Sequence, residues 1–327
     1  MTNSLINKQI VWIAWERHRR TVELCRYFGF YLIIYEGINN RLLKYIIFTL
    51  KTLIDILKLR PHVLIVQNPS IVLTFIACIF KNLFGYKLIV DTHNGGILPE
   101  NKFLQRLSAV YKFFQKKADV TIVTNINLAN IVSRNNGIPF VMPDKLPEVR
   151  NSKTSSDLGM RLKIVYICTF GSDEPYIQVI EAANHFSSNV SFLVTGNIKR
   201  VPITTVFSKP PNLTFTGFLP DDEYWGLLLS ADLIIDLTYR DDCLVCGAYE
   251  AVAAKVPLVL SDTVALRDYF NKGVVFTNNS TEDLVIKITY AVDNIQRLKE
   301  EINCLNTQLR NEWNEVARNF TTLLKGI

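Results

Sequence analysis

Two acidic residues, Asp242 and Glu250, flank seven residues in the run DDCLVCGAYEAVAAKVPLVLSD. Helix-forming residues predict a helix that begins near Gly247 and ends before Pro257, followed by a buried strand, PLVLSD. Glu250 would lie in the first turn and Asp242 in the loop before it. Amides at such a helix start favour an anion such as a diphosphate, while carboxylates accept sugar or ribose hydroxyls. A solvated loop acid followed by an ordinary helix-start acid is the alternative.

His93 is a second candidate, because it ends the apolar run LIVDTH and precedes Asn94, Gly95 and Gly96. Glycines let a ligand approach the backbone closely, and an imidazole can donate or accept a hydrogen bond near neutral pH. A structural histidine held by internal hydrogen bonds is the alternative.

A basic cluster, ERHRR, follows the first predicted strand where a dinucleotide-binding protein would carry glycines. Arg17, Arg19 and Arg20 could bind phosphate oxygens there. The motifs GxGxxG and GK[ST] are absent from the sequence, which speaks against an oxidoreductase or a kinase. No aromatic-interleaved basic platform or nucleic-acid-binding motif occurs either, so we expect no nucleic-acid partner.

The six cysteines are scattered, mostly within apolar runs, and nothing at the N-terminus resembles a cleavable signal. A reducing cytoplasm is the expected location. Cys243 and Cys246 form a lone CxxC without a second pair or a suitably spaced histidine. We therefore expect no metal site and interpret both cysteines as small packing residues of the loop.

Charge is distributed unevenly along the 327 residues. Residues 1–150 hold 20 Lys and Arg against 9 Asp and Glu, and the remainder holds 16 against 21. The basic half contains two apolar segments, YIIFTLKTLIDILK and IVLTFIACIFKNLF, which are too short and too interrupted to span a membrane. They would either cover a sheet as amphipathic helices or attach the protein peripherally to an anionic bilayer.

Short β-branched runs alternate with helical stretches throughout the chain, which predicts an α/β protein with doubly wound, parallel, Rossmann-like sheets. At about 150 residues per domain, the length predicts two domains. The linker SKTSSD divides them, giving domains at 1–152 and 153–305 and a terminal helix at 306–327. Ligands of such sheets bind beyond the carboxyl ends of the strands, so the two domains should face each other across a cleft. The predicted strands are QIVWIAW, FYLIIYE, VLIVQN, KLIVDTH, VTIVTN, PFVMP, KIVYICTF, VSFLVTG, LTFTGF, LIIDLT, PLVLSD and VVFTN.

From TFGSDEP onward, the segments FLVTGN, NLTFTGFLPDDEYWGLLLSADLIIDLT and DDCLVCGAYEAVAAKVPLVLSD resemble the nucleotide-sugar-binding domain of GT-B glycosyltransferases. They are most similar to the large retaining family four, whose members build surface polysaccharides and lipid-linked glycans. The resemblance is strong from about 160 to 280 and weaker before 150. Its most specific part is the acid pair with the helix and strand behind it.

The resemblance implies a role for each candidate residue. Glu250 would hold the donor ribose, Asp242 would face the donor sugar, and His93 would contact that sugar near the reacting carbon. Amides of the loop before the helix would bind the diphosphate, and the TGFLP loop would border the nucleobase. The implied donor site comprises Gly171, Gly196, Gly217, Phe218, Leu219, Arg240, Cys243, Leu244, Val245, Cys246 and Gly247, and the implied phosphate or acceptor site comprises Arg17, Arg19, Arg20, Asn94 and Gly95.

Two positions depart from the family pattern. Asp242 stands where the family usually has Glu, and GSDEPYIQ lacks the Arg and Lys that usually neutralise the diphosphate. Arg240 or the ERHRR cluster would have to compensate.

The resemblance thus implies a retaining glycosyltransferase, which we expect to be independent of metal ions and to use no cofactor. It would use a nucleotide-diphosphate sugar and a glycan or polyprenyl-linked acceptor. A nucleotide-sugar epimerase on the same fold and a non-catalytic glycosyltransferase-like subunit are the rivals.

Overall fold

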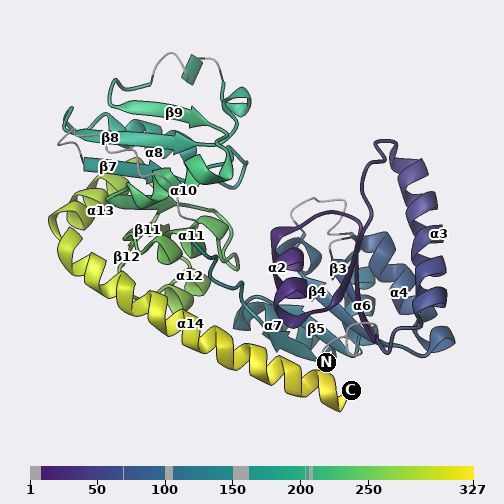
Figure 1. Ribbon diagram of the computed structural model, residues 1–327. Helices are drawn as coiled ribbons and strands as arrows, with labels where there is room; N and C mark the ends of the chain where they lie inside the picture. The colour runs from purple at the N-terminus through teal and green to yellow at the C-terminus, as the bar shows by residue number, and fades with distance from the viewer. Residues whose placement is uncertain (1–8, 69, 100–105, 150–161, 203, 206–208) are drawn as a thin grey trace. The chain divides into compact units, whose positions relative to one another are not determined.

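The computed structural model describes residues 9–68, 70–99, 106–149, 162–202, 204–205 and 209–327 (Figure 1). The chain forms two compact units. The first comprises residues 1–145 and 315–327, and the second comprises residues 146–314. The predicted linker SKTSSD and the predicted boundary at 152/153 lie outside the described residues.

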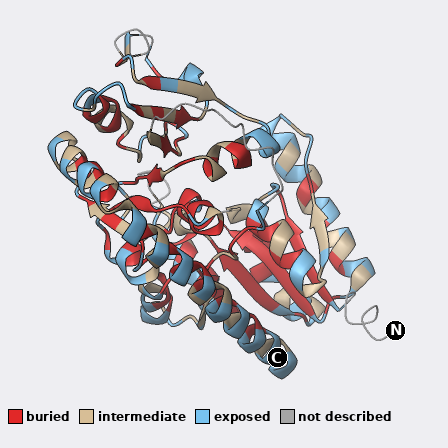
Figure 2. Ribbon diagram, turned by 60° about the vertical axis from the view of Figure 1, so that its left-hand side comes forward, coloured by how far each residue is buried: buried red, intermediate tan, exposed pale blue. Residues whose placement is uncertain are grey.

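The first unit is built on a six-stranded sheet in the order β2-β1-β3-β4-β5-β6, in which all pairs are parallel. The central strands are buried on both faces, which explains their continuous apolar sequence (Figure 2). The strand order reverses between β1 and β3, so their carboxyl ends form the switch point where a ligand would bind. The strands are β1 (Ile10–Ala14), β2 (Tyr31–Ile34), β3 (Val63–Asn68), β4 (Lys87–Thr92), β5 (Val120–Val123) and β6 (Pro139–Val141).

Helices of the first unit pack their apolar faces onto this sheet. Phe48 and Ile56 of α3 and Leu73 of α4 join the same core as Val11 and Leu64 of the sheet. The helical segments are α2 (Arg19–Phe28), α3 (Arg41–Leu59), α4 (Ile71–Phe84), η1 (Asn94–Gly96), α6 (Ser108–Lys117) and α7 (Ile126–Arg134).

The second unit has a six-stranded parallel sheet in the order β12-β11-β10-β7-β8-β9. Renumbered from its own first strand, this is the doubly wound Rossmann order, with the switch point between β7 and β10. The strands are β7 (Leu162–Tyr166), β8 (Val190–Thr195), β9 (Leu213–Gly217), β10 (Leu233–Asp236), β11 (Leu258–Ser261) and β12 (Val274–Thr277). The predicted strands and the α/β fold class are therefore confirmed in both units, and the cleft expected between them stays a prediction.

Helices cover both faces of the second sheet, as separate cores on its two sides show. The helix predicted from near Gly247 is α11, and the strand predicted after Pro257 is β11. The helical segments are α8 (Tyr176–Ala183), η2 (Ile198–Arg200), α10 (Asp221–Leu229), α11 (Cys246–Ala254), α12 (Val264–Tyr269), α13 (Thr281–Asp293) and α14 (Ile295–Gly326).

The C-terminal segment is helical, as the sequence predicts, and the stretch expected as a separate helix at 306–327 is the later part of the continuous α14. Ile302 and Leu309 of this helix lie in a core of the second unit. Phe320 belongs to the first unit, where its ring contacts Phe28 at 5.4 Å and Phe140 at 5.2 Å between centroids. Among the residues that the structure describes, no helix combines the length and apolar character needed to cross a membrane.

Candidate functional site

Glu250 lies on α11, one turn beyond its start and directly behind the loop that leaves β10. Only 9% of the residue is exposed. The hydroxyl of Tyr224, on α10, donates a hydrogen bond of 2.5 Å to Oε2 of Glu250. Burial with a specific donor distinguishes this carboxylate from an ordinary solvated helix-start acid.

Asp236 is a buried acid beneath the same helix and is not among the predicted site residues. It ends β10 close to the backbone N–H groups of Gly247 and Ala248, and its buried Oδ2 has no hydrogen-bond partner among the described residues. Burial raises the pKa of Asp236 well above its usual range, and the nearby carboxylates of Glu174 and Glu250 raise it further. The only sequence signal is an acid at the end of the apolar run LIID.

Gly247 has no room for a side chain, because an added Cβ would lie 2.5 Å from Oδ2 of Asp236. This close approach places the Asp236 carboxyl against the first turn of α11. The expected role of the Gly247 amide toward a diphosphate stays a prediction. The remaining part of the expected loop consists of Cys243 to Cys246.

That loop is anchored by its apolar members. Leu244 and Val245 are buried in the core of the second unit, whereas Cys243 is half-buried and Cys246 is exposed. Both cysteines are free thiols. Cys243 packs against the core as expected, and the exposure of Cys246 does not fit its interpretation as a packing residue. Asp242, at the start of the loop, is half-buried.

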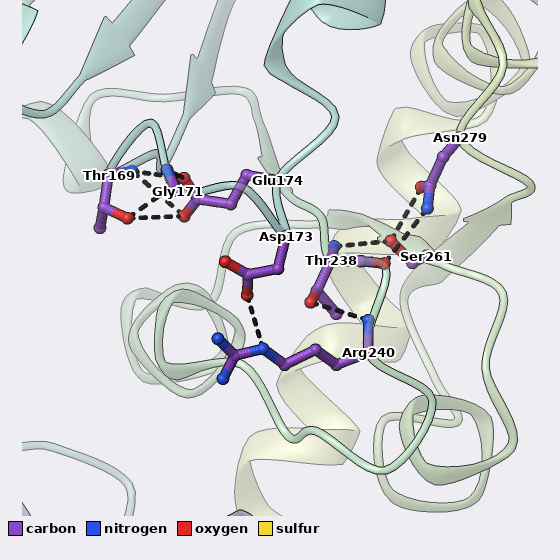
Figure 3. Close-up of polar contacts among 8 residues, drawn as sticks. All are labelled: Thr169, Gly171, Asp173, Glu174, Thr238, Arg240, Ser261 and Asn279. Atoms are coloured by element: carbon purple, nitrogen blue, oxygen red, sulfur yellow. Dashed lines mark hydrogen bonds and ion pairs between the residues drawn. The ribbon is translucent and has the colours of Figure 1, made fainter. Parts of the chain in front are cut away.

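The loop after β7 contains the acids that stand where the family pattern has basic residues (Figure 3). Oε2 of Glu174 accepts from the amides of Thr169 at 2.9 Å and Gly171 at 2.7 Å. The Glu174 carboxylate therefore fixes the conformation of the loop through hydrogen bonds to the loop's own amides. Gly171, an expected donor-site residue, supplies one of the amides that Glu174 uses.

Arg240 reaches this loop from the neighbouring strand, across the switch point (Figure 3). Its Nε lies 2.9 Å from Oδ2 of Asp173, and the amide of Tyr239 donates to the Asp173 carbonyl at 2.7 Å. A guanidinium thus stands beside the loop that lacks its own basic residue, and the role of Arg240 toward a diphosphate stays a prediction.

A network of neutral side chains fixes the strand end that carries Arg240 (Figure 3). The amide of Thr238 donates to Oγ of Ser261 at 2.8 Å, and that hydroxyl donates to Asn279 at 2.8 Å. Oγ1 of Thr238 accepts from the Arg240 amide at 3.1 Å. The backbone position of Arg240 is therefore set by three adjacent strand ends.

Two glycines shape the neighbouring loops. Gly196, after β8, has φ +106°, and an added Cβ would lie 2.2 Å from the Cys168 carbonyl oxygen. Gly217, at the end of β9, accepts from the Gly196 amide at 3.2 Å. Phe218, which follows, is 88% exposed and Leu219 is half-buried, so an apolar ring is exposed at this edge.

In the first unit, His93 follows β4 at the carboxyl edge of the sheet, and its ring lies against that of His18. Nε2 of His93 and Nδ1 of His18 are buried, and neither has a hydrogen-bond partner within the described part of the chain. Oδ2 of Asp91 is 3.9 Å from Nε2 of His93, beyond hydrogen-bond distance. Asn94 and Gly95 form the half-buried turn η1 beside them.

The pKa of His93 is lowered from its ordinary 6.5, first by burial, and then by the nearby His18 and Arg20. Asp91 and Asp144 oppose this shift. His93 is therefore neutral at pH 7, with one nitrogen to donate and one to accept. The structural alternative of an internally satisfied histidine does not fit the unpartnered Nε2. His18 lay within the predicted basic cluster but was not singled out.

The three arginines of the cluster differ in their surroundings. Arg20 is buried, and its Nε donates to Asp91, its Nη1 to Asp144 and its Nη2 to the Met142 carbonyl. Its guanidinium is thus held by internal acceptors, which corrects the expectation that it is presented to a phosphate.

The other two arginines are exposed. Nε of Arg17 lies 3.7 Å from Oε1 of Glu36. Arg19 forms an ion pair with Glu23, one turn further along α2. They are the members of the cluster that an anion could reach.

Within the described residues, no group of three or more His, Cys, Asp or Glu side chains is arranged to hold a metal ion. No protein-family model and no curated protein matches the chain.

Solved structures are similar to it over nearly its whole length. HepE from Anabaena in complex with UDP-glucose has a TM-score of 0.74 at 12% identity, covering 96% of this chain and 99% of that one. Sucrose-phosphate synthase from Thermosynechococcus elongatus has a TM-score of 0.79 at 13% identity, covering 97% and 98%.

A proposed UDP-N-acetylglucosamine 2-epimerase from Listeria monocytogenes has a TM-score of 0.67 at 11% identity, covering 98% and 97%. At such low identities the likeness establishes architecture alone. The chain has the GT-B fold, built from two Rossmann-like units.

Proposed function

We propose that the protein is a glycosyltransferase that moves a sugar from a nucleoside diphosphate donor to a hydroxyl group of a glycan or polyprenyl-linked acceptor. The observation that carries this proposal is the buried Glu250 carboxylate, fixed by Tyr224 at the ligand-binding edge of a Rossmann sheet. A carboxylate oriented in this way can accept both hydroxyls of a ribose. The complex of HepE with UDP-glucose makes a UDP-sugar the first donor to test.

The positive charges and amides near the expected diphosphate would stabilise the transition state electrostatically. In transfer, the bond between the anomeric carbon and the diphosphate breaks, a bond to the acceptor oxygen forms, and the proton of the acceptor hydroxyl passes to the departing diphosphate. Arg240 and the start of α11 would stabilise the negative charge that develops on the diphosphate. His93, neutral at pH 7, would contact the transferred sugar. We propose retention of anomeric configuration and independence from metal ions, as the resemblance implies.

The direct test incubates the purified protein with UDP-, GDP-, ADP- and dTDP-linked sugars, with and without a membrane lipid extract. Mass spectrometry of the lipids should show one added sugar with one donor class, and EDTA should leave the rate unchanged. NMR of the product reports the anomeric configuration. Absence of both transfer and donor hydrolysis across the panel, with no nucleotide binding, would contradict the proposal and leave a non-catalytic subunit.

Likeness to the Listeria protein makes a nucleotide-sugar epimerase the second candidate. An epimerase needs no acceptor, so it would convert the donor alone into a second nucleotide sugar. Chromatography of each donor incubated with the protein in the absence of lipid separates the two. A transferase leaves the sugar configuration of the remaining donor unchanged.

A further inference from the structure

Helix α3 has two apolar faces, and the sheet covers only one of them. Phe48, Thr52 and Ile56 are buried against the first unit. A second set of large apolar side chains, each 46 to 71% exposed, consists of Leu42, Leu43, Ile46, Leu50, Ile54 and Leu57. Most of these follow one another at intervals of three or four residues, so they form a stripe along the solvent side of the helix.

A row of lysines borders this stripe. Lys44, Lys51 and Lys58 recur every seven residues, which places them on one line along α3 between its buried and exposed apolar faces. The one acid in the helix, Asp55, accepts a hydrogen bond from the Tyr35 hydroxyl. The helix therefore presents apolar side chains beside a row of positive charges.

The neighbouring helix α4 also exposes apolar side chains. It packs beside α3 (Figure 1), and its residues Phe75, Ile79 and Leu83 are exposed at four-residue intervals. The Phe75 ring lies 6.3 Å from that of Phe113 on α6, where Lys112 and Lys116 are also exposed. Both apolar segments found in the sequence thus cover the sheet with one face and expose apolar residues on another.

We propose that the exposed stripes of α3 and α4 dock on a lipid bilayer that contains anionic lipid. Leucine and isoleucine side chains would enter the boundary between headgroups and acyl chains, while the lysines reach anionic headgroups. The charge balance of +11 over residues 1–150 adds to this attraction. A second copy fits less well, because lysine rows on two copies would repel each other.

This inference rests on the proposed function, because a polyprenyl-linked acceptor lies in a bilayer. It adds how the protein would reach that acceptor. Its physical test needs neither donor nor transfer. Co-sedimentation is measured with vesicles of phosphatidylcholine and with vesicles that also contain phosphatidylglycerol. The wild-type protein should bind the second kind at least about tenfold more tightly and lose that preference in high salt.

Two variants separate the apolar and the charged parts. Ile46→Ser with Leu50→Ser and Leu57→Ser should weaken binding to anionic vesicles at least tenfold. The matched control replaces Ile126, Ile138 and Ile286, which are 56 to 62% exposed on other elements, by Ser and should bind as wild type. Lys44→Gln with Lys51→Gln and Lys58→Gln should remove the preference for anionic vesicles.

Circular dichroism and nucleotide binding report whether each variant is folded. The inference is overturned if the wild-type protein binds neither kind of vesicle or binds both equally. It is also overturned if the serine and glutamine variants bind as tightly as wild type. If the wild type binds no vesicles but is a dimer, and the serine variant is a monomer, the surface would instead contact a second copy of the chain.

Discussion

His18 and His93 lie with their ring centroids 4.3 Å apart and their planes inclined by 52°. The two rings come from residues that follow different strands, β1 and β4, and meet only because these strands share one sheet. A positive charge on His18 at this distance would repel a protonated His93, so His18 is one of the groups that lower the pKa of His93.

Replacing His18 with Asn should raise the pKa of His93. In the wild-type protein this pKa is below 6.5, and His18 is one of the groups that lower it. The imidazole of His93 should therefore remain neutral to a lower pH in the wild type than in the variant. Titration of the histidine ring signals by NMR measures both values.

His62→Asn is the matched control, since His62 precedes β3 and is not among the groups that shift the pKa of His93. It should leave the His93 titration unchanged. A wild-type His93 pKa above 6.5 would contradict this interaction. So would a His93 pKa that is the same in the wild type and in His18→Asn.

His93→Asn should lower the rate of sugar transfer about a hundredfold, the usual contribution of a positioned proton-transferring or hydrogen-bonding group. Because the proposed nucleotide site lies in the second unit, affinity for the nucleoside diphosphate alone should change less than about threefold. Steady-state transfer assays and calorimetry measure these two quantities, with His185→Asn as the control. Equal losses in nucleotide affinity and transfer would place His93 in nucleotide binding instead.

Arg240→Gln should weaken binding of the nucleoside diphosphate about tenfold, because it removes the cation beside the β7 loop. Binding of the corresponding nucleoside, which has no phosphate, should not change. Arg267→Gln is the control, because Arg267 is also paired with an aspartate of the same unit, Asp262. If nucleoside and diphosphate affinities fall together, Arg240 supports the fold of the site and not the phosphate charge.

Asp236→Asn should gain stability relative to the wild type as the pH rises. The folded-state pKa of Asp236 is raised above its unfolded value, so the folded protein holds a proton that the unfolded chain releases. The wild type therefore loses stability with rising pH above about 4, by up to about 1.4 kcal/mol per pH unit until this group ionises. The amide variant lacks this dependence.

Thermal unfolding of both proteins between pH 5 and pH 8 measures the difference. Asp268→Asn, at an exposed position on α12, should track the wild type at every pH. A constant offset between wild type and Asp236→Asn would mean that Asp236 is ionised in the folded protein across this range.

Most of the fold follows from local sequence. Parallel strands buried on both faces are continuous apolar runs, so VLIVQN and PLVLSD predict β3 and β11 directly. The start of α11 near Gly247 follows from helix-forming residues, and its end follows from Pro257. The helical character of the C-terminal segment follows from its periodic apolar pattern, and α14 is continuous from Ile295 to Gly326.

The candidate site could be predicted only in part. The sequence singles out Glu250 and His93 because they stand at the ends of predicted elements, and their roles stay predictions. Arg20 was assigned to a phosphate because its partners, Asp91 and Asp144, are 71 and 124 residues away in the chain.

Asp236 and His18 were missed for the same physical reason. Their significance comes from burial and from neighbours that only the sheet order brings together. The role of Glu174 as an internal acceptor likewise depends on the conformation of its loop.

Calorimetry of nucleoside diphosphates tests the central claim, that Glu250 holds the ribose of a donor nucleotide. The wild-type protein should bind one of UDP, GDP, ADP or dTDP, and Glu250→Gln should weaken that binding at least about tenfold. Glutamine can still accept from Tyr224, but it replaces one hydroxyl-accepting oxygen with a donor. Glu300→Gln, at an exposed position on α14, should bind as wild type. Binding that is absent for all four nucleotides, or equal in wild type and Glu250→Gln, would contradict the account.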